Sequence, residues 1–156
     1  MTIREKIDKI IEIILVSIMS ILVLDVLWQV FSRYVLSAPS SFTDELAGFL
    51  LIWVGMLGAA YVAGKNEHLA IDLMLQKMKG AKKRRLQIII NSLVGLFALF
   101  VMVVGGSWLV YTRFYLQVKS AALALPLGYV YLIVPLSGLL IIYYAIDNSL
   151  NQNIEE

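Results

Sequence analysis

The sequence predicts an all-α membrane protein with four transmembrane helices and both chain ends in the cytoplasm. Three observations predict this fold class. Of the 156 residues, 60% are hydrophobic and 15% are charged, with a mean hydropathy of +0.83, which leaves too little polar surface for a soluble domain of this size. Apolar residues form four long runs. Basic residues gather in alternate segments between these runs.

The apolar runs have the length of membrane-spanning helices. About 20 residues at roughly 1.5 Å each cross the hydrocarbon core, and the runs lack the period-two alternation of barrel strands. The first run exceeds the core of a signal peptide, so we expect it to be retained as a span. One membrane domain over 1–156 is expected, with spans at about residues 10–34, 44–64, 85–112 and 125–147.

The distribution of basic residues predicts the orientation, because Lys and Arg resist translocation. Ten of the 13 lie before the first span or between the second and third. The remaining three are Arg33, Arg113 and Lys119. Both ends and the middle connection are therefore expected in the cytoplasm.

The middle connection predicts an interfacial helix at about residues 68–79. Apolar residues share one face of this segment, which suits a helix lying in the headgroup layer beside anionic lipid. A helix packed on a soluble protein is the alternative. The predicted lipid contacts are Lys77, Lys79, Lys82, Lys83, Arg84 and Arg85.

The segment before the second span predicts a turn followed by a helix start. Residues 37–41 are turn-forming, and Thr43, Asp44 and Glu45 then place a cap and acids where a helix dipole favours them. Helix capping and docking of a partner both remain open for the two acids. In the fourth span, Pro126 suits the first turn and Pro135 predicts a kink.

Few residues inside the spans are candidates for subunit or docking contacts. Asp25 is an acid at depth, with Gln29 one turn further and Arg33 at the span end, and intramembrane acids normally face protein. Gly55 and Ala59 belong to a run of small residues in the second span, which permits close helix packing within the chain or against another subunit.

Catalytic and cofactor chemistry is not expected in this chain. It has no cysteine and one histidine, His68, which excludes thiolate sites and bis-histidine haem. No phosphate-binding glycine loop or nucleophile with a base can be assembled. We expect no enzyme activity, no cofactor and no nucleic-acid partner.

Five short motifs resemble those of one family. They follow one another in the same order and with the same spacing as in that family, and they cover most of the chain. They are Trp28 to Tyr34, Phe42 to Leu46, Trp53 to Ala60, Glu67 to Asp72, and Ala122 to Pro126 followed by Tyr131 and Pro135. The chain thus resembles the DctQ-like small membrane subunit of tripartite ATP-independent periplasmic (TRAP) transporters. Phe42 stands where the family usually has Trp.

The resemblance implies a bacterial inner-membrane system for organic acids of the dicarboxylate or sialic acid class. In such systems a periplasmic binding protein delivers the solute, and a large membrane subunit moves it with sodium. The small subunit would scaffold the large one and help to dock the binding protein, with the sodium sites in the large subunit. A self-sufficient four-helix carrier built around Asp25, or an accessory subunit of another membrane complex, are the alternatives.

Overall fold

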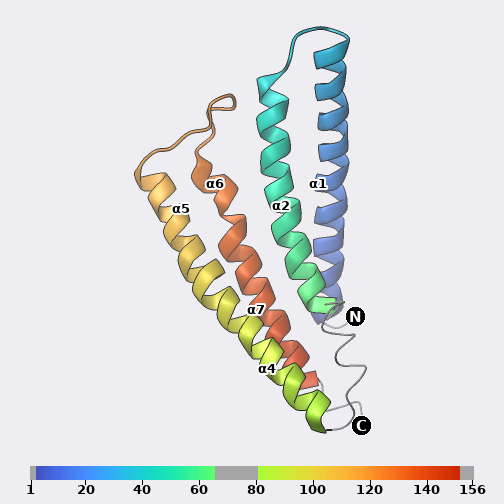
Figure 1. Ribbon diagram of the computed structural model, residues 1–156, viewed down its shortest axis with the longest axis vertical. Coiled ribbons are helices and arrows are strands. Elements are labelled where there is room, and N and C mark those ends of the chain that lie inside the picture. The colour runs from blue at the N-terminus through green and yellow to red at the C-terminus, as the bar shows by residue number, and fades with distance from the viewer. Residues whose placement is uncertain (1–2, 66–80, 152–156) are drawn as a thin grey trace. The chain divides into compact units, whose positions relative to one another are not determined.

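The computed structural model describes residues 3–65 and 81–151, and every regular element in these ranges is a helix. Long apolar stretches without interior proline form the first three spans. The elements are α1 (Ile3–Tyr34), α2 (Ser41–Lys65), α4 (Ala81–Phe97), the π-helix η1 (Ala98–Gly105), α5 (Gly106–Tyr115), α6 (Leu127–Tyr131) and α7 (Ile133–Asn151). Figure 1 labels the α-helices.

Within residues 3–65 and 81–151, four helical stretches are long and apolar enough to cross a membrane, as the sequence predicts. They are Arg4–Tyr34, Ser41–Lys65, Arg85–Tyr115 and Leu127–Ser149. The third stretch is continuous through α4, η1 and α5. The interfacial helix expected at 68–79, with Lys77 and Lys79, lies outside the described residues.

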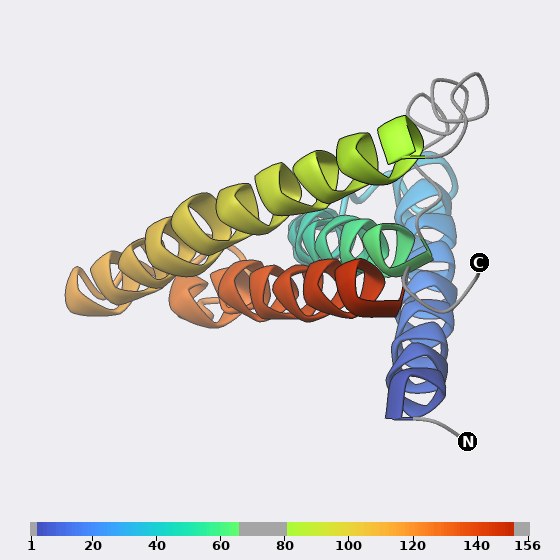
Figure 2. The ribbon, with the colours of Figure 1, turned by 90° about the horizontal axis from the view of Figure 1, so that it is seen from below.

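The chain divides into two compact units. The first combines Met1–Gly58 with Leu109–Ile133, and the second combines Ala59–Trp108 with Val134–Glu156. In the first unit, α1 and the start of α2 form an antiparallel pair joined by a turn (Figure 1). In the second unit, α4 and η1 run alongside α7 (Figure 2).

Large apolar side chains point outward from most helices, as in a protein surrounded by lipid. Leu24 in α1 is 67% exposed and Phe100 in η1 is 63% exposed. Met102, two residues after Phe100, is buried. The helices therefore present apolar residues on both their packed and their outer faces, which explains why the apolar runs of the sequence are continuous.

Two sequence expectations about helix ends need correction. α2 begins at Ser41, before Thr43, and the amide of Thr43 lies 3.4 Å from the hydroxyl oxygen of Ser40. Ser40 is therefore the cap in place of Thr43. Pro126 precedes α6 with an extended backbone (φ −61°, ψ 119°) and so lies just before the first turn rather than in it.

The fourth span breaks three residues before Pro135. α6 ends at Tyr131 and α7 begins at Ile133. The ring of a proline clashes with the carbonyl group four residues earlier, here that of Tyr131, and so prevents a regular helix there. Gly138 is the site of close packing on η1: a Cβ there would lie 2.8 Å from the Cβ of Met102 and 3.0 Å from Cγ2 of Val103. Close approach to a neighbouring helix explains this glycine.

Candidate functional site

The connection between α5 and α6 folds into a short hairpin. The amide of Leu127 donates to the carbonyl of Val118 at 2.9 Å, and the amide of Ser120 donates to that of Leu125 at 2.9 Å. The hydroxyl of Ser120 accepts from the amide of Leu125 at 3.2 Å. The hairpin turns through Ala124, whose φ of 52° is left-handed. The three amides between Ser120 and Ala124 remain available for another acceptor.

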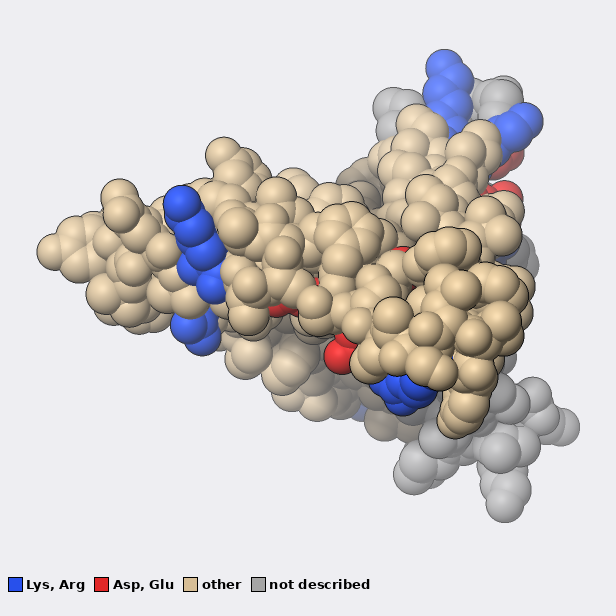
Figure 3. All heavy atoms as spheres, turned by 90° about the horizontal axis from the view of Figure 1, so that it is seen from above, with Lys and Arg blue, Asp and Glu red and all other residues tan. Residues whose placement is uncertain are grey.

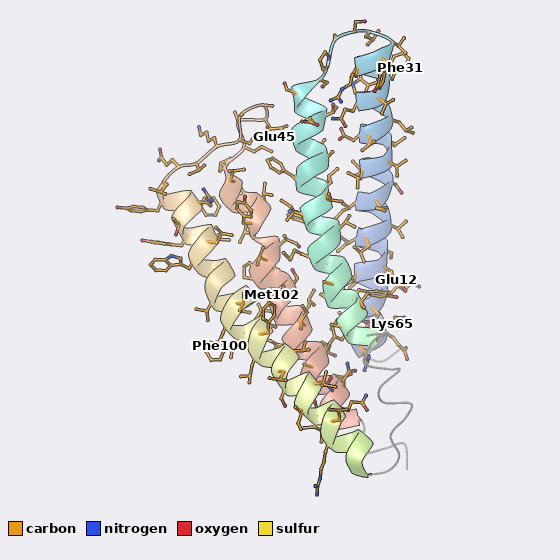
Figure 4. All side chains as sticks on the ribbon, viewed as in Figure 1. Glu12, Phe31, Glu45, Lys65, Phe100 and Met102 are labelled. Carbon is orange, nitrogen blue, oxygen red and sulfur yellow. The ribbon has the colours of Figure 1, made fainter. Side chains whose placement is uncertain are left out.

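Glu45 in α2 binds these three amides. Its Oε1 accepts from the amide of Ala121 at 3.0 Å, and its Oε2 accepts from Ala122 at 2.9 Å and Leu123 at 2.8 Å. Glu45 lies near the start of α2 on the side of the hairpin in Figure 4. Successive amides that converge on a carboxylate form a strong anion-binding arrangement. We call this set of contacts the Glu45 clamp; it fixes the hairpin to α2.

A second contact joins α1 to α2. The side-chain amide of Gln29 donates to the Oδ1 of Asp44. One turn beyond Gln29, the buried hydroxyl of Ser32 donates to the carbonyl of Gln29 at 3.0 Å. Arg33 occupies the last turn of α1 and is exposed. The structure thus brings Gln29, Asp44 and Glu45 to the same end of the first unit.

Aromatic side chains hold the base of the hairpin. Phe114 of α5 packs edge-on against Tyr129 of α6 at 5.0 Å, and its ring lies where a side chain at Gly128 would be. The indole of Trp53 in α2 donates to the carbonyl of Val130 at 3.1 Å. Because α2 contacts both the hairpin and the helix that follows it, the connection is held at two points.

The surface at this end is mostly uncharged. Figure 3 views it with Lys, Arg, Asp and Glu coloured, and uncharged atoms cover most of the visible face. Tyr34, Tyr115 and Tyr129 are exposed on the first unit, as are Asp44 and Lys119. Exposed aromatic residues suit both the membrane interface and a protein contact. In the ranges 3–65 and 81–151, no three metal-ligating side chains form a site.

The other predicted site residues lie apart from the Glu45 clamp. Asp25 is 8% exposed, and its Oδ2 finds no hydrogen-bond partner in the described part of the chain. Gly55 and Ala59 lie further along α2 and are exposed, with no atom within 4 Å of a Cβ placed at Gly55. Arg85 in α4 is also exposed. The remaining basic residues, Lys82, Lys83 and Arg84, are in the first turn of α4.

Comparison with known proteins decides the family. Residues 22–153 match the family described as the DctQ component of tripartite ATP-independent periplasmic transporters. The chain belongs to this DctQ family. It is a small TRAP permease subunit with several spans in the bacterial inner membrane.

Three relatives illustrate the similarity. The chain is 27% identical over 137 residues to a TRAP transporter small permease protein of Haemophilus influenzae, covering 86% of this chain and 82% of that one. It is 31% identical to the sialic acid TRAP transporter small permease protein SiaQ of Vibrio cholerae, over 56% of this chain and 50% of that protein. It is 34% identical to the sialic acid TRAP transporter permease protein SiaT of Haemophilus influenzae, over 46% of this chain and 12% of that protein.

The Glu45 clamp joins two segments on which the DctQ resemblance rests. Phe42 to Leu46 contains Glu45, and Ala122 to Pro126 contains two of the bound amides and the left-handed Ala124. Sequence reasoning considered Glu45 for helix capping or docking and missed its partners in the hairpin. A short connection of small residues that follows a serine was the signal that could have suggested a tight turn with free amides.

Proposed function

We propose that this DctQ-family chain is a scaffold subunit without catalytic or transport chemistry of its own. It would enlarge the membrane body of a large permease subunit. On the outside it would offer part of the surface on which a soluble solute-binding protein docks. The observation that carries the docking role is the Glu45 clamp. A hairpin held by three hydrogen bonds from its backbone amides is ordered before a partner arrives, which reduces the entropy cost of binding.

The orientation supports an external position for the Glu45 clamp. The segments joined at this end carry Arg33, Arg113 and Lys119, against ten basic residues in the other segments. By the positive-inside rule the hairpin faces the periplasm and both chain ends face the cytoplasm. A periplasmic binding protein would meet the hairpin and the α1–α2 turn.

A large permease partner is supported by the names and lengths of the relatives. The match covers only 12% of the permease protein SiaT. In SiaT, the segment that is similar to this chain is therefore part of a much longer polypeptide. In the present chain the same association would be made between separate subunits. The exposed Gly55 and Ala59 are the proposed contacts to the large permease. Asp25 is 8% exposed, so it would act inside the chain and not at that surface.

Solute and sodium handling are assigned to the large permease in this proposal. Asp25 is an isolated acid within long spans that are otherwise nearly free of ionisable groups, whereas the binding site of a secondary transporter holds several polar groups. An organic acid of the sialic acid or dicarboxylate class remains the proposed solute, and no cofactor is assigned to this chain.

Reconstitution tests the proposal. Liposomes would contain this chain alone, its large permease alone, or both, with the binding protein and a sodium gradient supplied outside. Uptake is expected only when both membrane subunits and the binding protein are present. Uptake by this chain alone would establish the self-sufficient carrier instead, and undiminished uptake without this chain would remove the scaffold role.

A further inference from the structure

A groove runs between two helices of the second unit and is graded from polar to apolar along its length. It encloses about 510 Å³, within the range of roughly 300–1,000 Å³ typical of small-molecule sites. We call it the α4–α7 groove. Its lining residues are Asn91, Ser92, Gly95, Leu96 and Leu99 on one side and Ile142, Ala145, Ile146 and Ser149 on the other.

The polar end of the groove has hydrogen-bonding capacity to spare. The side-chain amide of Asn91 donates to the hydroxyl of Ser149 at 3.5 Å, and that hydroxyl donates to the carbonyl of Ala145 at 2.7 Å. Asn91 retains a second N–H and its carbonyl oxygen. The neighbouring Ser92 is exposed. A polar headgroup could therefore bind at this end.

The middle and far end of the groove are apolar. Gly95 faces Ala145, whose Cβ would be 3.7 Å from a Cβ at Gly95, so small residues form the floor. Leu99 and Ile142 complete the far end. From Asn91 to Leu99 the helix rises about 12 Å, which accommodates a large part of one acyl chain.

Positive charge lies beyond the polar end. Arg85 is exposed and precedes Ser92 by seven residues, which places it on the same face of α4 about 10 Å nearer the helix start. Three further basic residues precede it in the first turn. Basic residues at the end of a spanning helix attract anionic headgroups. The order along the helix is therefore positive charge, hydrogen-bonding groups, then apolar floor, which is also the order of parts in an anionic phospholipid.

We propose that the α4–α7 groove binds an anionic glycerophospholipid, with its phosphate between Arg85 and Asn91 and one acyl chain along Gly95 and Ala145. This inference goes beyond the scaffold role and does not depend on it, because the groove, its polar end and Arg85 all belong to this chain. A helix of the large permease is the other occupant that the experiment must distinguish. An apolar helix would leave the charge of Arg85 without a partner, which favours the lipid.

Photolabelling of the intact complex tests the proposal. The probe is phosphatidylglycerol with a photoreactive group in its acyl chain, mixed into vesicles of phosphatidylglycerol and phosphatidylethanolamine that contain this chain with its large permease. Peptide mapping is expected to find labels within residues 91–99 and 142–149. Labels confined to other segments of the chain would overturn the proposal.

Two variants and two matched controls sharpen the test. Leu99→Trp fills the far end and should abolish labelling in the groove, whereas Leu93→Trp, at a 62% exposed position of α4 outside the groove, should not. Arg85→Gln should lower labelling by phosphatidylglycerol about fivefold, and Arg33→Gln should leave it unchanged. Arg85→Gln changes an exposed residue, so it tests the proposal even where Leu99→Trp fails to fold.

The alternative occupant gives a different result. If the large permease covers the groove, the complex shows no label there, and Leu99→Trp but not Leu93→Trp reduces recovery of the large permease. That pattern would overturn the lipid proposal. Normal recovery of the large permease with Leu99→Trp, together with lost labelling, would support it.

Discussion

Gly138→Ala is expected to destabilise the packing of α7 on η1. The new Cβ would lie 2.8 Å from the Cβ of Met102, 3.0 Å from Cγ2 of Val103 and 3.3 Å from the carbonyl oxygen of Ala98. Carbon atoms pack best at about 3.5–4.0 Å. One of the three neighbours is backbone and another is a Cβ, so neither can turn away by a change of rotamer. Helix α7 must therefore move away from η1.

The size of the effect follows from comparison with Gly55→Ala. Replacing a helical glycine with alanine gains about 1 kcal/mol in helix propensity, and both variants share this gain. Gly55 has no atom within 4 Å of the added Cβ, so it carries no packing penalty in the chain. Overpacking at Gly138 costs about 1–3 kcal/mol. The free energies of unfolding of the two variants should therefore differ by about 1–3 kcal/mol, with Gly138→Ala the less stable.

Reversible unfolding in mixed micelles measures this difference. The three tryptophans of the chain report the transition, and each variant is compared with the original sequence at several detergent fractions. Equal free energies of unfolding for Gly138→Ala and Gly55→Ala would refute the assigned packing of α7 on η1. A loss of stability with Gly55→Ala and not with Gly138→Ala would show that Gly55, and not Gly138, lies at a close helix contact.

Three further predictions address the site and the topology. Glu45→Gln removes the charge from the Glu45 clamp. The three hairpin amides should then exchange hydrogen faster, and docking of the binding protein should weaken. Unchanged hydrogen exchange would show that the clamp does not hold the hairpin. Asp25→Leu removes a buried acid whose Oδ2 has no hydrogen-bond partner in the described chain. The free energy of unfolding of the isolated chain should therefore rise by about 1–3 kcal/mol; a destabilised chain would show that the carboxyl group has an internal structural role. The chain lacks cysteine, so single cysteines can be introduced without background labelling. Those at the exposed Ala38 and Ala122 should react with an impermeant thiol reagent outside the cell, and one at Gly80 should not. External labelling at Gly80 would show that the orientation is inverted.

Some of the fold could be predicted because its causes are local in the chain. A run of about 20 apolar residues must form its own hydrogen bonds in lipid, and a helix satisfies them within the segment. Pro135 interrupts the fourth span by a local steric effect, and the helix does break just before it. The π-helix in the third span has no such local marker.

The candidate site was predicted only in part. Gln29, Asp44 and Glu45 were identified as polar residues near span ends, and the structure gathers them at one end of the first unit. Their partners were not predicted, since Glu45 binds amides 76 to 78 residues further along the chain. No periodicity or local propensity reports which backbone amides will meet a given carboxylate.

The sequence by itself determined the membrane class, the four spans and the family, because hydropathy and short motifs are properties of contiguous residues. Only the tertiary structure decided that Glu45 fastens the hairpin, that Gly138 is a point of close helix contact, and that Asp25 is buried without a partner for its Oδ2 in the described chain. Each of these depends on which helix faces meet. In lipid the apolar outer face and the apolar packed face of a helix have similar composition, so the choice of face rests on shape and on a few polar contacts between distant segments.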